Sequence, residues 1–208
     1  MENRTYHHGN LGEALVTAGV TLARSGGPDA VVLRAASREA GVSHNAAYRH
    51  FASHEDLLAA VAARCMEQLG RLMLERAAEA GAAEADAGPE ARARARLEAI
   101  GRAYVDFALT EHGWFRTAFC GAAPSPERHP PTRPEPGTDP YLLLAARLDE
   151  LVDAGVLPPE RRPGAEYAAW SAVHGLAHLL TDGPLHDLPP EEVRRAVDTV
   201  LAAVARGL

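Results

Sequence analysis

The chain has 208 residues, of which 47% are hydrophobic and 24% are charged, so it can bury a sizeable core and is not disordered as a whole. A net charge of −7 argues against a protein that coats nucleic acid without specificity. The sequence contains neither a membrane-span pattern nor a signal-peptide core, and its two cysteines are far apart. We therefore expect a cytoplasmic protein with reduced thiols.

Ala and Leu dominate the sequence and alternating β-branched runs are nearly absent, which predicts an all-α fold of about nine helices. Helical spacing of apolar residues, together with capping and breaking residues, sets their approximate limits. The expected helices cover residues 10–24, 33–40, 44–51, 53–80, 90–112, 114–120, 141–154, 164–182 and 189–206. Residues 121–140 hold seven of the 15 prolines and predict a long loop.

The second and third expected helices are joined by Gly41, Val42 and Ser43, a spacing typical of a helix-turn-helix. In that unit the second helix enters the DNA major groove, and its exposed side chains meet bases and phosphates. Asn45 could then pair with adenine and Arg49 with guanine or phosphate, while Tyr48 and His50 could donate to phosphates. An ordinary solvated helical hairpin fits the spacing equally well.

The stretch LRAASREAGVSHNAAYRHFASHEDLLAAV (33–61) resembles the signature of TetR-family transcriptional regulators, and YHHGNL (6–11) resembles the approach to their first helix. The resemblance implies a three-helix DNA-binding domain, expected at 1–55, and a helical ligand-binding and dimerisation domain, expected at 56–208. It also implies repression that a small molecule relieves. The candidate DNA contacts are Tyr6, His7, His8, Arg34, Ser43, His44, Asn45, Tyr48, Arg49, His50 and His54.

The sequence departs from the family pattern at four positions. Val32 stands where a hydroxyl-bearing cap is frequent, so we expect the second helix to lack that cap. Asn45 and Ala47 replace a frequent Gly and a larger apolar residue, and His54 replaces a frequent Lys. These changes leave the scaffold intact but bear on the operator sequence and on phosphate affinity.

The C-terminal part contains YAAWSAVHGLAHLLTDG (167–183), which resembles the WHG subclass of these regulators. This helix is almost free of charge and rich in small residues, and the last helix carries an apolar stripe. Two such helices from each of two subunits predict a four-helix homodimer interface.

Aromatic and histidine side chains of the C-terminal part predict a cavity for a small molecule. The candidate ligand residues are Tyr104, Phe107, Trp114, Phe115, Phe119, Trp170, His174 and His178. A plain packed core would explain each of them as well. His174 and His178 are four residues apart and compatible with a metal, with Glu111, His112 or Cys120 as a third ligand. Hydrogen-bonded core or pocket histidines are the alternative, and we expect no metal and no cofactor.

The sequence shows no nucleophile elbow, phosphate-binding glycine loop or zinc-protease motif, so we do not expect an enzyme. The function favoured is a homodimeric repressor that binds double-stranded, pseudo-palindromic operator DNA and is released by a small-molecule inducer, with no membrane partner. The alternatives are a helical protein-protein adaptor and, less favoured, a small helical-bundle enzyme.

Overall fold

A computed structural model describes residues 11–121 and 137–207. These residues form nine α-helices, two short 3-10 helices and no strand, which confirms the all-α prediction. The α-helices are α1 (Leu11–Gly26), α2 (Leu33–Glu39), α3 (His44–His50), α4 (His54–Ala83), α5 (Pro89–Thr110), α6 (His112–Ala118), α7 (Pro140–Asp153), α8 (Ala165–Thr181) and α9 (Pro190–Gly207). The 3-10 helices are η1 (Pro28–Ala30) and η2 (Pro159–Arg161). Residue 10, where the first expected helix begins, and most of the expected loop 121–140 lie outside the described residues.

Local capping explains where the helices around the predicted helix-turn-helix begin and end. Gly41, just after α2, has a φ of 67°, a left-handed conformation that glycine adopts without a Cβ clash. The hydroxyl of Ser43 accepts a hydrogen bond from the Ala46 amide at 3.2 Å and so caps α3. Val32 precedes α2 and provides no side-chain cap, as the sequence predicted.

Within the described residues the chain divides into two compact units, and the division differs from a simple cut at residue 55. The first unit takes the residues up to Met66 and returns to the chain at Gly113, so it includes most of α6. The second unit takes Glu67–His112 and the described residues after the gap. The units therefore share α4, which begins in one and ends in the other.

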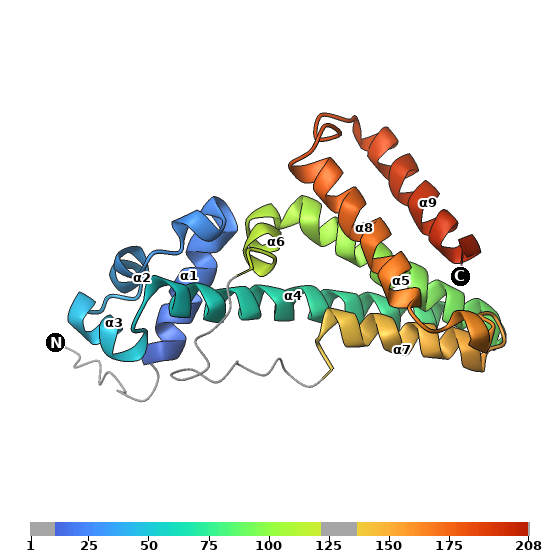
Figure 1. The fold of residues 1–208 in the computed structure, drawn as a ribbon, viewed down its shortest axis with the longest axis horizontal. Helices are drawn as coiled ribbons and strands as arrows, with labels where there is room; N and C mark the ends of the chain where they lie inside the picture. The colour runs from blue at the N-terminus through green and yellow to red at the C-terminus, as the bar shows by residue number, and fades with distance from the viewer. Residues whose placement is uncertain (1–10, 122–136, 208) are drawn as a thin grey trace. The chain divides into compact units, whose positions relative to one another are not determined.

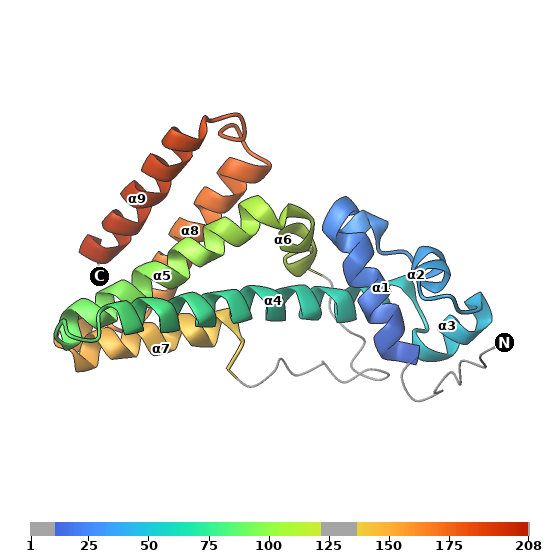
Figure 2. The ribbon, with the colours of Figure 1, turned by 180° about the vertical axis from the view of Figure 1, so that it is seen from behind.

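The first unit is built on α1, which packs against α2, α3 and η1 (Figures 1 and 2). Its core combines residues from α1 to α4 that are fully removed from water, among them Leu15, Val31, Leu57 and Val61. Burial of such side chains contributes roughly 1.5–3 kcal/mol each to folding. Gly19 of α1 has no room for a Cβ, which would lie 2.5 Å from a methyl group of Val61.

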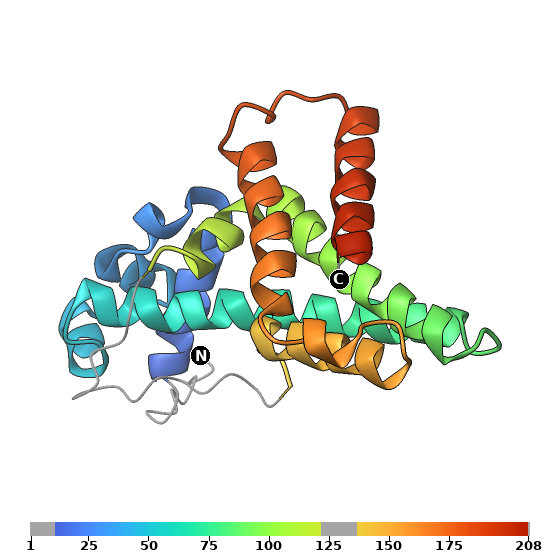
Figure 3. The ribbon, with the colours of Figure 1, turned by 45° about the vertical axis from the view of Figure 1, so that its right-hand side comes forward.

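In the second unit, α5 is the central helix, because it packs against α7, α8 and α9. Helices α8 and α9 run side by side as a hairpin, which Figure 3 shows with both helix axes in view. Along α5, the residues Leu97, Ile100, Tyr104 and Phe107 are buried at helical spacing. No helix in the described ranges is long and apolar enough to cross a membrane.

Candidate nucleic-acid interface and cavity

Helix α3 presents a polar outer face on a buried apolar base. Ala47 and Phe51, on the inner side, are 0% and 5% exposed. On the outer side His44, Asn45, Tyr48 and Arg49 are exposed, and His50 is partly so. The rings of His44 and Tyr48 meet edge to face with centroids 4.7 Å apart, so neighbouring donors are held together on this face. Tyr48 is 50% exposed, so much of its side chain is open to a binding partner.

Further candidate contacts flank α3 in the first unit. Arg34 at the start of α2, Ser43 before α3 and His54 at the start of α4 are all exposed. The hydroxyl of Ser53 accepts from the Asp56 amide at 3.1 Å and caps α4. The amino-terminal end of α4 thus presents the exposed His54, in the same first turn as Glu55 and Asp56. Tyr6, His7 and His8 lie outside the described residues.

Helix α6 packs on α1 within this first unit. The indole nitrogen of Trp114 donates to the carbonyl of Val20 at 2.8 Å, and the Arg24 guanidinium lies 4.9 Å from the centre of the Trp114 ring. A Cβ at Gly113 would lie 2.2 Å from the carbonyl oxygen of Ala23, so only glycine permits this approach. Trp114, Phe115 and Phe119 therefore belong to the unit that carries α3.

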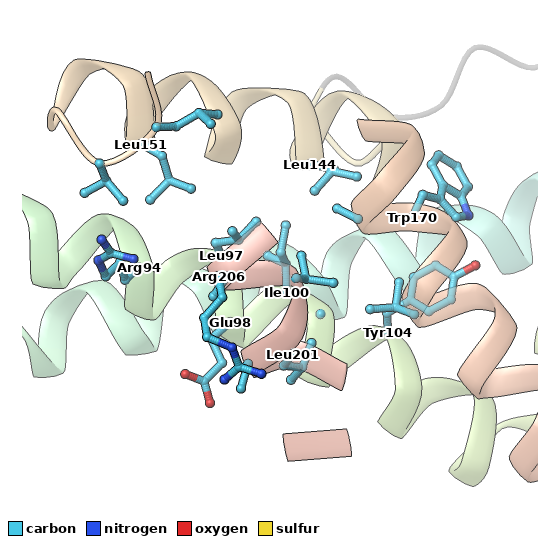
Figure 4. A pocket seen from close by; sticks show the side chains of 18 of the residues that line it. Arg94, Leu97, Glu98, Ile100, Tyr104, Leu144, Leu151, Trp170, Leu201 and Arg206 are labelled. Carbon is cyan, nitrogen blue, oxygen red and sulfur yellow. The ribbon is translucent and has the colours of Figure 1, made fainter. Parts of the chain in front are cut away.

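A cavity of about 720 Å³ lies in the second unit, a size suited to a small organic molecule. Figure 4 shows Tyr104 and Trp170 at one end of it and Arg94 toward the other, with Leu97, Ile100 and Leu144 between them. The wall is mainly aliphatic and comes from α5, α7, α8 and α9. The ring centroids of Tyr104 and Trp170 are 6.5 Å apart, at an interplanar angle of 68°.

The charged groups around the cavity are mostly arginines. Arg94 of α5, Arg161 of η2 and Arg206 of α9 come from three separate elements. Two carboxylates, Glu98 and Asp198, also line the cavity. Both bind the guanidinium of one further arginine, Arg102, at 2.9 and 2.8 Å.

Behind Tyr104 a chain of polar side chains runs along α8. The Tyr104 hydroxyl and Nδ1 of His174 are 2.7 Å apart, and the rings of His174 and His178 have centroids 4.6 Å apart. Asp182 then lies 4.0 Å from Nδ1 of His178 and 3.1 Å from Nε2 of His112. Burial raises the pKa of Tyr104, so its hydroxyl stays protonated and is able to donate to His174.

Partial burial of the ring lowers the pKa of His174, and the positive charge of a protonated His178 lowers it further. The neutral ring that results is the form whose Nδ1 can accept from Tyr104. In the described part of the chain no group of three or more His, Cys, Asp or Glu residues is arranged to hold a metal ion.

The eight candidate ligand residues do not meet in one cavity. Tyr104 and Trp170 line it, His174 lies behind Tyr104, and His178 is exposed. Phe107 is buried in the second unit but is not part of the wall. Trp114, Phe115 and Phe119 lie in the first unit, so we leave them out of the proposed ligand site.

Comparison with known families settles what kind of chain this is. The N-terminal family profile of bacterial regulatory proteins of the tetR family matches residues 15–61. The profile of the tetracyclin repressor-like C-terminal domain matches residues 97–204, which is more than half of the chain. The chain belongs to the TetR family. It is a DNA-binding transcription regulator with a helix-turn-helix at α2 and α3.

Solved structures have the same TetR-family fold over almost the whole chain. A protein of unknown function from Rhodococcus sp. RHA1 is 28% identical, with a TM-score of 0.69 and coverage of 99% of both chains. A TetR family transcription regulator from Marinobacter aquaeolei VT8 is 18% identical, with a TM-score of 0.56 and coverage of 92% of this chain and 94% of that one. No curated protein matches this TetR-family chain.

Two features of this TetR-family regulator were not anticipated from its sequence. One is the arginine group Arg94, Arg161 and Arg206, whose members are far apart along the chain. The only local sign of it is that Arg94 lies three residues before the buried Leu97 on α5. The other is the membership of α6 in the DNA-binding unit, for which the small residue Gly113 beside Trp114 was the available signal.

Proposed function

We propose that the protein is a homodimeric repressor that binds a pseudo-palindromic operator and leaves it when a small molecule occupies the cavity of the second unit. The observation that carries the proposal is the polar outer face of α3 on its buried base of Ala47 and Phe51. Such a face fits a recognition helix, which must pack on one side and meet a groove on the other.

The residues of α3 divide into those that position the protein and those that read sequence. Tyr48 and His50 donate to phosphates, and losing them weakens binding on every sequence alike. Asn45 and Arg49 contact base edges, and losing a bidentate pair costs about 1–3 kcal/mol at one base position. Arg34 and His54 add phosphate contacts at the starts of α2 and α4.

The dimer is proposed to form through α8 and α9. On α8, the residues Tyr167, Ala168, Gly175 and Leu179 are exposed, although most of the helix is apolar. A Cβ at Gly175 would meet nothing within 4 Å in this chain, which leaves room for a second helix to approach. Two recognition helices in such a dimer must be about 34–36 Å apart to enter successive major grooves.

Helix α6 offers a route by which a ligand changes DNA binding. The cavity residues Ile100 and Tyr104 lie on α5, which ends at Thr110, and α6 begins two residues later. Contacts of Trp114 and Gly113 hold α6 against α1. A movement of α5 is therefore transmitted through Glu111 and α6 to the DNA-binding unit. A tenfold loss of operator affinity needs about 1.4 kcal/mol of differential ligand binding.

The test is selection of genomic fragments by the purified protein, followed by footprinting of the retained DNA. The proposal expects protection of an inverted repeat whose half-sites are one helical turn apart, and weaker binding as salt concentration rises. A folded protein that protects no discrete site would refute it. Arg76→Gln, exposed on α4, is the matched control for Arg49→Gln on α3.

A further inference from the structure

The second unit contains a local surplus of positive charge on a chain whose net charge is −7. Three arginines line the cavity, and the two carboxylates in its wall both bind a fourth arginine, Arg102, which is not itself part of the wall. The other three, Arg94, Arg161 and Arg206, form no ion pair with any described residue. Arg161 donates to the backbone carbonyl of Gly207.

In Figure 4 the labelled arginines Arg94 and Arg206 both lie away from the two aromatic rings, with Arg206 beside Glu98 nearer the middle of the cavity. The exposed Arg94 is near Leu151, and Tyr104 and Trp170 are at the other end (Figure 4). Between them the wall is aliphatic, with Leu97 and Ile100 almost completely buried. A ligand that fills the aliphatic part gains apolar burial, and only an anionic group gains from the arginines of the wall.

We propose that this cavity binds an amphipathic anion, with an extended apolar body against Leu97, Ile100 and Leu144 and an anionic head group at Arg94, Arg161 and Arg206. The inference rests on the proposed function, because it names the class of molecule that occupies the regulatory cavity. Guanidinium groups from three elements suit a head group with several acceptor oxygens, since each presents planar paired donors. A cationic head would be repelled by the same three groups.

The chain's own tryptophans allow a direct binding test. There are two, and Trp114 lies in the first unit, so in a Trp114→Phe background the fluorescence reports Trp170 at the cavity wall alone. The probes are dodecanoate, its neutral methyl ester and dodecyltrimethylammonium, which share one alkyl chain and differ in head-group charge. The two ionic probes are titrated below their critical micelle concentrations and the ester below its solubility limit, and the thermal midpoint of the unmodified chain is followed in parallel.

We expect dodecanoate to bind about tenfold more tightly than the methyl ester, and the cation to bind most weakly. The double substitution Arg94→Gln with Arg206→Gln should make the dodecanoate and ester affinities equal. Arg76→Gln, exposed on α4 and not part of the wall, should leave the preference unchanged.

Equal affinity for the three probes, tighter binding of the cation, or no binding by any of them to folded protein would overturn the proposed ligand class. Operator binding is measured separately by footprinting, so the two proposals fail in different assays. A chain that binds its operator but ignores head-group charge refutes the ligand class alone. A chain with the arginine-dependent preference and no specific DNA site refutes the repressor proposal instead.

Discussion

Substituting Gly113 by alanine tests how tightly α6 is seated on α1. The added Cβ would lie 2.2 Å from the carbonyl oxygen of Ala23 and 2.3 Å from that of Arg24, both backbone atoms. The Ala23 oxygen also accepts a hydrogen bond from the Gly27 amide at 2.8 Å, so it cannot turn aside without breaking that bond. Relief of the clash must come from displacement of α6.

The expected cost combines overpacking, about 1–3 kcal/mol, with one weakened hydrogen bond, about 1 kcal/mol. We therefore expect Gly113→Ala to lower the free energy of unfolding by about 2–4 kcal/mol and the thermal midpoint by about 5–15 °C. Urea titration followed by tryptophan fluorescence measures the free energy of unfolding, and calorimetry measures the thermal midpoint. The fluorescence emission of Trp114 should also shift to the red, because its indole no longer packs against α1.

Gly12→Ala is the matched control, since Gly12 is also a helical glycine of the same unit. A Cβ there meets only a ring nitrogen of His50, at an ordinary 3.6 Å. That substitution should leave stability unchanged or raise it by up to about 1 kcal/mol. If Gly113→Ala were as stable as Gly12→Ala, with unaltered Trp114 emission, α6 would not be packed on α1 as described.

Three further predictions concern the helix-turn-helix, the cavity and pH. Ser43→Ala removes the cap of α3 and should cost about 1 kcal/mol in stability and weaken operator binding in a gel-shift titration, whereas Ser43→Asp should retain the cap and the stability. Trp170→Ala should abolish release by ligand while operator affinity of the free protein is unchanged; a mutant that still responds to ligand would exclude Trp170 from the site. The pKa of His174 is lowered in the folded state, so the unfolded chain binds a proton at this ring more readily than the folded chain does. His174 therefore contributes stability above about pH 6.5, and this contribution is lost as the pH falls below that value. Urea midpoints between pH 5 and pH 8 should therefore fall more steeply in acid for the wild type than for His174→Gln, and parallel profiles would refute this role.

The parts of the fold that depend on short-range signals were predictable from the sequence. Gly41 acts through its own backbone torsion and Ser43 through the amide of Ala46, so the end of α2 and the start of α3 follow from residue type and spacing. The buried stripe of α5 follows from its helical period for the same reason. Within the described ranges, each expected helix is present with limits shifted by a few residues.

The sequence was a poorer guide to which side chains come together from distant parts of the chain, because residue type does not say which unit a side chain joins. Trp114 and Phe115 follow α5 closely in sequence, and their aromatic character suits a cavity as well as a core. The backbone contact at Gly113, which holds them in the first unit, depends on α1 almost ninety residues earlier. A period of 3.6 residues identifies which face of a helix is buried, but it does not identify the element that packs against that face.

The left-handed residue Gly41 determines which amino acids the turn between α2 and α3 can accept. Nothing lies within 4 Å of a Cβ placed there, so even a large side chain would find space. The obstacle is its φ of 67°, a torsion that costs ordinary L-residues roughly 1–2 kcal/mol and costs asparagine or aspartate less. Tolerance at this position should therefore follow backbone torsion and not side-chain volume: asparagine should be accepted more readily than alanine, and the β-branched residues least of all.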